Sequence, residues 1–330
     1  MHETQKRKGE HVDIVLNQDV QGHQSNGFDE IRFNYYALPE QDYHAIRLET
    51  KFLGHKLQAP FMVTGMTGGY TDAQKINSEL AQACDAEGIV FAVGSQRAML
   101  ENKTLTKTYT VKKPGLFLCG NIGAYQLKQY SIKQIQSLVD DIDADALCIH
   151  LNPLQEAVQP EGDKNWSNVL QKIAEACDAL SIPVIAKEVG AGINATIARE
   201  LEKAGCAAID VSGTGGTSWS AVEHHRHGLS GDVFWDFGIP TAQALQQCAK
   251  TVKVPLIASG GIRSGLEAAK AIRLGASLVG AASPLIKAQQ QGGVAGARKH
   301  IQKFKHELRT TLFLTRSKNL QELKKAQLIQ

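Results

Sequence analysis

Residues 254–283 decide the fold, and they include PLIASGGIRSG at residues 255–265 and SLVG at residues 277–280. Residues 255–258 and 277–280 are short apolar runs typical of strands, and residues 266–274 between them have helical spacing. Glycines at a strand end let backbone amides approach an anion, and the following helix presents its unpaired N–H groups and the positive end of its dipole to that anion. The stretch therefore predicts a phosphate-binding loop like those after strands 7 and 8 of a (β/α)8 barrel.

Six more apolar runs precede this pair, and each ends in, or is followed directly by, a small, polar or charged residue. They occupy residues 59–65, 89–94, 115–120, 146–151, 183–187 and 207–211. Stretches with helical spacing separate them, the first of which is Ala73–Glu87 before Gly88. Buried strands that alternate with helices indicate a parallel sheet, and eight units favour closure as a TIM barrel over an open doubly wound sheet.

The chain has 330 residues, of which 43% are hydrophobic and 21% charged, as in a globular protein. We expect one domain with an N-terminal arm (residues 1–54), the barrel (55–315) and a tail (316–330). The arm should contain a helix over Glu3–Asn17. A long connection rich in Gly and Ser at residues 213–238 is interpreted as a lid. Residues 297–315 are predicted to form a closing helix, and the last dozen residues a charged helix or a frayed tail.

Charge and cysteine content narrow the class of protein. A net charge of +3 is too small to indicate a nucleic-acid partner. The six cysteines lie in apolar runs without a CxxC pair, which is typical of reduced, buried thiols in a cytoplasmic protein. Because neither a signal peptide nor an apolar run of membrane-spanning length occurs, we expect no membrane partner.

The strand ends carry polar residues, and in a barrel these ends meet at one mouth. Strand one is followed by GMTGG at residues 65–69, which suits a flat ligand or simply a tight turn, and strand two by GSQR at 94–97. Arg97 suits either an anion or a surface ion pair. Asn121-Ile-Gly123 after strand three indicates only a turn. Lys187 after strand five would either snorkel to the rim or place a cation beside a flavin.

Strand four ends in the sequence HLNPLQE at residues 150–156. His150 is as well explained by a structural hydrogen bond as by a functional role. Glu156 beside a phosphate-binding mouth suits Mg²⁺, which commonly takes one or two carboxylates and completes its shell with water and substrate phosphate. A glutamate that interacts only with a helix dipole would give the same pattern, and the sequence leaves both interpretations open.

Taken together, these motifs resemble the type 2 isopentenyl diphosphate isomerases. The resemblance extends from Arg7 to about Leu314, and it rests on an ordered set of motifs that shows no departure from the family pattern. The set comprises RKGEH at 7–11, MTGG at 66–69, GSQR at 94–97, HLN at 150–152 with QE at 155–156, KEVG at 187–190, SGTGGT at 212–217 and SGGIR at 259–263.

The resemblance implies a cytoplasmic homo-oligomer that interconverts isopentenyl and dimethylallyl diphosphate, with reduced FMN, Mg²⁺ and NAD(P)H as reductant. It implies that Glu156 binds Mg²⁺ and that Gln155 and His150 are the catalytic residues. The implied FMN contacts are Met66, Thr67, Gly68, Ser95, Asn121, Lys187, Ser212, Thr217, Gly261, Arg263, Ala281 and Ala282. The implied substrate contacts are Arg7, Lys8, Ser95, Arg97, His150 and Gln155.

Two other functions are compatible with the same barrel. An FMN-dependent 2-hydroxy acid oxidase would share the phosphate loop, but those enzymes carry a His-Gly pair after strand six, where Ser212-Gly213 occurs here. A barrel that only binds a phosphorylated ligand is the other alternative, because fold alone does not settle function.

Overall fold

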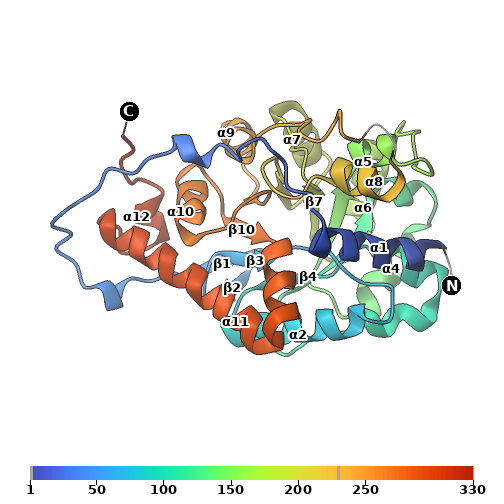
Figure 1. The fold of residues 1–330 in the computed structure, drawn as a ribbon, viewed down its shortest axis with the longest axis horizontal. Coiled ribbons are helices and arrows are strands. Elements are labelled where there is room, and N and C mark those ends of the chain that lie inside the picture. Colours follow the sequence, from blue (N-terminus) through green and yellow to red (C-terminus); the bar gives the residue numbers. More distant parts are fainter. Residues whose placement is uncertain (1–2, 229–230, 330) are drawn as a thin grey trace.

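Eight parallel strands form a closed barrel in the computed structural model, which describes residues 3–228 and 231–329 (Figure 1). This confirms the predicted TIM barrel. The strands are β3 (Phe61–Val63), β4 (Val90–Ala92), β5 (Leu118–Gly123), β6 (Ala146–Leu151), β7 (Val184–Glu188), β8 (Ala208–Asp210), β9 (Leu256–Ala258) and β10 (Leu278–Ala281). The barrel closes where β10 pairs with β3, with Val279 opposite Phe61.

The third barrel strand ends later than the sequence predicts. Asn121 to Gly123, interpreted above as a turn, continue β5 and pair with β6, so that Gly123 lies opposite His150. Because β6 runs on to Leu151, the extra residues of β5 find backbone partners there and remain buried. The longer ladder places Asn121 beside His150 at the mouth.

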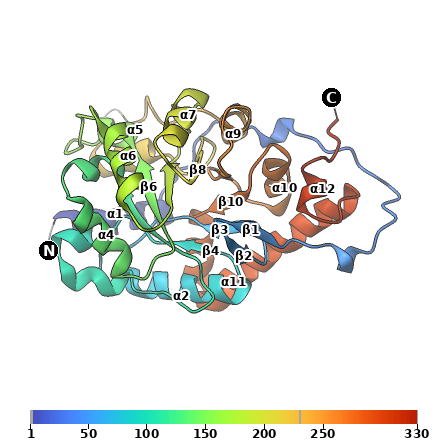
Figure 2. The same ribbon diagram turned by 180° about the vertical axis from the view of Figure 1, so that it is seen from behind.

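Helices surround the barrel and cover its apolar strands (Figures 1 and 2). They are α2 (Ala73–Glu87), α3 (Arg97–Glu101), α4 (Ile132–Asp140), α5 (Pro153–Val158), α6 (Val169–Ala179), α7 (Ala195–Lys203), α9 (Thr241–Ala249), α10 (Gly265–Arg273) and α11 (Ser283–Leu314). The predicted closing helix is the second half of α11, beyond a break at Gly292 and Gly293, and its Ile301, Phe304 and Leu308 are buried. No helix within residues 3–228 and 231–329 is long and apolar enough to cross a membrane.

The arm contains the predicted helix α1 (Glu3–Asn17), and an unpredicted hairpin spans the end of the arm and the first residues of the segment assigned to the barrel. The hairpin strands β1 (Thr50–Phe52) and β2 (His55–Leu57) lie beside β3 and β4 (Figure 2). Phe52 and Leu57 are buried among the residues that fill the barrel interior, including Phe117 just before β5. The hairpin therefore closes the barrel at the end opposite the polar mouth.

The long connection and the tail are more ordered than the sequence suggests. The connection contains helix α8 (Trp219–His227), which packs against α1 and α5. The tail forms the short helix α12 (Leu320–Leu323), whose Leu320 and Leu323 are buried. Beyond it, Leu328 forms a β-bridge with Phe33 of the arm. Within its described residues the tail is therefore docked on the barrel and not frayed.

Candidate functional site

A cavity of about 530 Å³ opens at the carboxyl ends of the strands, between α1 and the loops that follow β8, β9 and β10. This volume is ordinary for a cofactor or substrate site. Thr67 and Gly68 do not line the cavity, because their turn packs on Tyr109 and Asn77 behind the wall. The other predicted site residues line it: Arg7, Lys8, Met66, Ser95, Arg97, Asn121, His150, Gln155, Glu156, Lys187, Ser212, Thr217, Gly261, Arg263, Ala281 and Ala282.

One end of the cavity is formed by main chain from two adjacent loops. Gly260 and Gly261 have φ angles of 99° and 72°, in the region that favours glycine. A Cβ at Gly261 would lie 2.2 Å from the carbonyl oxygen of Gly215 in the loop after β8. Arg263 Nη2 donates to that same oxygen at 2.8 Å. The glycines are thus required for close contact between the loops, and Arg263 joins them.

The N-terminus of α10 is predicted from sequence to bind an anion, but side chains at the start of this helix already bond to its amides. Ser264 and Glu267 form a capping box on the first turn of α10, and Glu267 Oε2 also accepts from the Arg263 amide at 2.7 Å. The prediction that α10 offers unpaired N–H groups is therefore wrong. The first turn of α11 has no side-chain cap among the described residues, and its Ser283 and Pro284 line the cavity. Pro284 has no N–H, and the Leu285 and Ile286 amides bond to the Ala282 carbonyl oxygen, so an anion there would meet the Ser283 amide and the positive end of the helix dipole.

Charged and polar groups lie deep in the barrel mouth. The Lys187 side chain is buried and its Nζ donates to the Glu188 carbonyl oxygen at 2.7 Å, which excludes snorkelling to the rim. Burial raises the pKa of nearby Asp210, although Lys187 and a 2.8 Å hydrogen bond from Ser259 favour its charged form. Ser212 has a φ of 37°, a strained value held by the surrounding loops.

His150 is a neutral imidazole in this site. Burial, helped by the charges of Lys187 and Lys8, lowers the pKa of His150 to about 3. Its Nδ1 lies 2.8 Å from Asn121 Oδ1, and because a carbonyl oxygen only accepts, Nδ1 carries the proton. His150 Nε2 is then left as a hydrogen-bond acceptor at the cavity wall.

Gln155 and Glu156 lie in the first turn of α5, where Pro153 fixes the start of the helix. Asn152 Nδ2 donates to Gln155 Oε1 at 3.1 Å and to Glu156 Oε1 at 2.9 Å. Glu156 Oε2 accepts from the Asp163 amide at 2.8 Å. Across residues 3–228 and 231–329, no three His, Cys, Asp or Glu side chains are grouped to hold a metal, so a metal at Glu156 would take most of its ligands from water or a bound anion.

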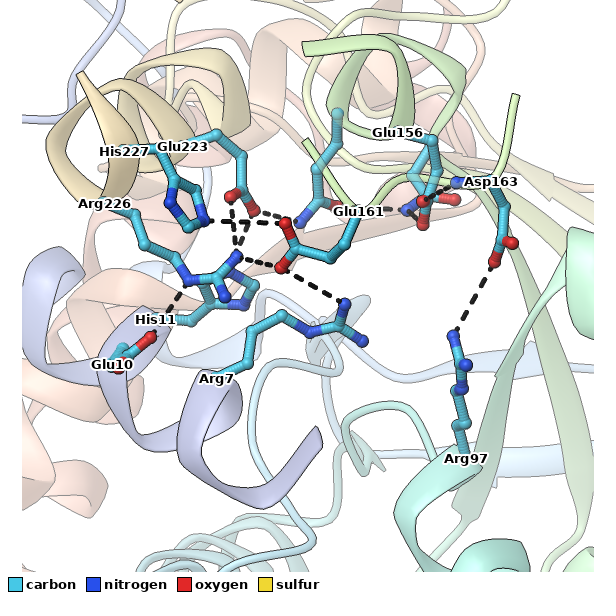
Figure 3. Close-up of polar contacts among 12 residues, drawn as sticks. Arg7, Glu10, His11, Arg97, Glu156, Glu161, Asp163, Glu223, Arg226 and His227 are labelled. Carbon is cyan, nitrogen blue, oxygen red and sulfur yellow. Dashed lines mark hydrogen bonds and ion pairs between the residues drawn. The ribbon is translucent and has the colours of Figure 1, made fainter. Parts of the chain in front are cut away.

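Glu223 on α8 is a site residue that the sequence analysis missed. Gln155 Nε2 donates to Glu223 Oε1 at 3.0 Å, and His11 Nε2 lies 2.9 Å from the same oxygen (Figure 3). Burial opposes ionisation, yet His11, Gln155 and Arg226 together lower the pKa of Glu223 to about 2. Glu223 is 68 residues from Gln155 in the chain, and no motif links them.

The arm brings two cations to the cavity. Lys8 Nζ donates to the Ser95 carbonyl oxygen and lies 3.3 Å from the Tyr109 hydroxyl. Removal from water, together with the charge of Arg7, lowers the pKa of Lys8 to about 7. Close to Lys8, Arg97 Nε donates to Glu101 at 2.9 Å while its side chain also lines the cavity, so Arg97 both forms an ion pair and remains available to a ligand.

Comparison with known proteins first defines the class. The family described as FMN-dependent dehydrogenase matches residues 127–330. Mandelate oxidase, a solved structure, superposes with a TM-score of 0.69 and 16% identity over 98% of each chain, which supports the fold alone. The chain is therefore a barrel of the FMN-dependent dehydrogenase class.

Two archaeal proteins place the chain more narrowly. The isopentenyl-diphosphate delta-isomerase of Pyrococcus furiosus is 44% identical over 98% of this chain and 86% of its own length. That of Pyrococcus horikoshii is also 44% identical, over 98% of this chain and 91% of its own length. The chain belongs to the isopentenyl-diphosphate delta-isomerase family.

Proposed function

We propose that the protein interconverts isopentenyl diphosphate and dimethylallyl diphosphate in isoprenoid biosynthesis, by addition of a proton at one carbon and removal of a proton from another. The observation that carries the proposal is one cavity that joins the main-chain cradle at Gly260 and Gly261 to the cations of the arm and to Gln155 and Glu156. The cradle suits a cofactor phosphate, and the arm cations suit the diphosphate of a substrate.

FMN fits the residues present, because the glycine cradle, the uncapped start of α11 and buried Lys187 offer donors for its phosphate and ring. When bound in its reduced form, FMN supplies an electron-rich ring and a nitrogen able to exchange protons; NAD(P)H is the proposed reductant, and the reaction is redox-neutral overall. We assign its contacts to Met66, Ser95, Asn121, Lys187, Ser212, Thr217, Gly261, Arg263, Ala281 and Ala282, and leave out Thr67 and Gly68, which lie behind the cavity wall.

The diphosphate would be bound by Arg7, Lys8 and Arg97, with Ser95 at the same wall. Glu156 would supply one carboxylate to Mg²⁺, and water and the diphosphate would fill the remaining positions. Gln155 has its carbonyl held by Asn152 and its amide held by Glu223, so its orientation beside the reacting carbons is fixed before substrate binds. Neutral His150 would accept a hydrogen bond there and would not add positive charge.

The direct test is an anaerobic assay of isopentenyl diphosphate conversion with FMN and Mg²⁺, with and without a reductant. We expect dimethylallyl diphosphate only when the flavin is reduced, with no net consumption of reductant after priming. Absence of product with reduced FMN and Mg²⁺ would reject the proposed function. The family resemblance also supports a cytoplasmic homo-oligomer, and light scattering of the purified protein tests the oligomer.

A 2-hydroxy acid oxidase is the second candidate, and similarity of fold to mandelate oxidase is what favours it. Ser212-Gly213 occupies the position of the His-Gly pair of such oxidases, and His224, His225 and His227 lie further along, on α8. Oxygen consumption with lactate or glycolate would favour the oxidase. A preparation that is colourless and takes up no FMN would instead favour a barrel that only binds a phosphorylated ligand.

A further inference from the structure

The turn between α5 and α6 presents an acidic side chain to two other parts of the chain. Glu161 Oε1 lies 2.6 Å from Arg226 Nη1 of α8 and 3.8 Å from Arg7 Nη1 of the arm (Figure 3). His227 Nε2 lies 3.6 Å from Glu161 Oε2. One carboxylate thus contacts the arm, α8 and its own turn, and the function proposed above gives it no role.

The main chain holds Glu161 in place from both sides. The Gly162 amide donates to the Gln159 carbonyl oxygen at 3.0 Å, and the Asp163 amide donates to Glu156 Oε2 at 2.8 Å. A Cβ at Gly162 would lie 1.9 Å from the Glu156 carbonyl oxygen, so the turn is pressed against α5. The turn that carries Glu161 is therefore fixed against the helix that carries Gln155 and Glu156.

Arg226 does not depend on Glu161 for its charge balance. Its Nε donates to Glu10 at 3.0 Å and its Nη1 to Glu223 at 3.2 Å. Arg7 is in a different position, because its side chain is 19% exposed and lines the cavity. With its amide oriented to satisfy both neighbours, Gln159 accepts from Arg7 Nη1 at 2.9 Å and donates to Glu223 at 3.1 Å. Beside this hydrogen bond, Glu161 is the carboxylate that forms an ion pair with Arg7.

We propose that Glu161 is a positioning residue that holds Arg7 at the cavity wall for the diphosphate, an inference that rests on the proposed function. An arginine side chain loses rotamer freedom when it is ordered, and this loss opposes binding. A carboxylate that orders Arg7 before the ligand arrives removes part of that cost from binding. At 3.8 Å the pair is loose enough for Arg7 to turn its remaining N–H groups to a diphosphate.

The test is Glu161→Gln, which keeps the shape of the side chain and removes its charge. We expect KM for isopentenyl diphosphate to rise roughly three- to tenfold, with kcat and FMN content unchanged. Glu10→Gln is the matched control, because it removes another carboxylate from Arg226 at 3.0 Å and should leave KM unchanged. An unchanged KM in Glu161→Gln would overturn the proposal. A lower KM would overturn it too, because it would mean that Glu161 competes with the diphosphate for Arg7.

A double-mutant cycle identifies Arg7 as the residue through which Glu161 acts. In an Arg7→Ala background, Glu161→Gln should raise KM no further, whereas additive effects would overturn the proposal. Calorimetry with Mg²⁺ and inorganic pyrophosphate gives a readout without catalysis, and weaker binding by Glu161→Gln is expected. Wild-type protein that binds no pyrophosphate would reject the diphosphate function itself, while equal binding by wild type and Glu161→Gln would reject only the role of Glu161.

Discussion

At the scale of single residues, Glu156 illustrates how one position can serve the fold and the chemistry together. Its two oxygens accept hydrogen bonds from Asn152 and from the Asp163 amide, and it lies in the first turn of α5, where the helix dipole favours a negative charge. These contacts explain a glutamate without any metal. A test of the Mg²⁺ role must therefore measure a property that a change in helix stability would not alter.

Glu156→Gln should separate the two roles, because the substitution keeps the shape and removes the charge. If Glu156 binds Mg²⁺, activity with saturating reduced FMN should fall at low Mg²⁺ and partly recover as Mg²⁺ is raised. If it only interacts with the dipole, the change should cost about 0.3–1 kcal/mol of stability. Superimposable Mg²⁺ titrations of wild type and variant would remove Glu156 from the metal site.

Lys8 should couple substrate binding to proton uptake. With a pKa of about 7, this amine is largely neutral at pH 8 in the free protein. A bound diphosphate favours the charged form and so raises the pKa of Lys8, and affinity should fall as pH rises above 7. Calorimetry of pyrophosphate binding at pH 8 in buffers of different ionisation enthalpy should show the uptake. Lys8→Met should take up close to one proton fewer, and equal uptake by both proteins would contradict the prediction.

Site residues that lie at the end of a strand could be predicted from the sequence. Lys187, Asn121 and His150 do, and the barrel brings them to one cavity. Glu223 could not be predicted, because its importance depends on α8 lying across α5, a contact between segments that share no sequence pattern. The capped start of α10 could have been predicted, since Ser264 and Glu267 have the spacing of a capping box.

At the scale of elements, residues 10–24 of the arm bind the connection after β8 through several separate contacts. The Ser218 amide donates to the Val20 carbonyl oxygen at 2.8 Å, and Trp235 Nε1 donates to the Gln21 carbonyl oxygen at 2.9 Å. Val15 and Val20 also pack against the apolar side of α8. The connection interpreted from sequence as a lid is thus attached to the arm as well as to the barrel.

Deletion of residues 1–24 should release α8 while the barrel stays folded. Without its partners on α1 and the following segment, α8 has little buried apolar surface to hold it, so its amides should exchange with solvent roughly tenfold faster or more. Hydrogen exchange measured by mass spectrometry would report α8 and the β5–β6 ladder separately. The prediction fails if α8 keeps its protection, or if the barrel strands lose theirs to the same degree.

At the scale of the whole molecule, eight strand–helix units were readable from sequence because each strand is a continuous apolar run. The hairpin of β1 and β2 was not, because Thr50–Phe52 and His55–Leu57 are too short and too polar to form a strand signal. Packing determines the position of the hairpin, because Phe52 and Leu57 fill the open end of the barrel.

Phe52→Ala should therefore destabilise the entire barrel without weakening the site. Phe52 is buried against Phe117, with ring centroids 6.1 Å apart, and truncation of such a side chain costs about 3–5 kcal/mol. Denaturant unfolding should show this loss while KM and FMN content stay the same, since the cavity lies at the opposite end. Leu38→Ala, at a side chain that is 67% exposed, is the control and should cost about 0.5 kcal/mol or less. A similar small loss for both variants would contradict the role of the hairpin.

Because most of its thiols are buried, their rates of reaction with a thiol reagent report when each part of the protein opens. Cys84, Cys119, Cys148, Cys206 and Cys248 are buried, and Cys177 alone of the six is partly exposed. A thiol reagent in water should modify Cys177 promptly and reach the others only when the structure opens around them. Cys119 and Cys148 share the barrel interior, whereas Cys84 lies on α2, Cys206 just before β8 and Cys248 on α9. The order in which these four places become labelled would therefore trace how the closed sheet comes apart, under native conditions and without denaturant.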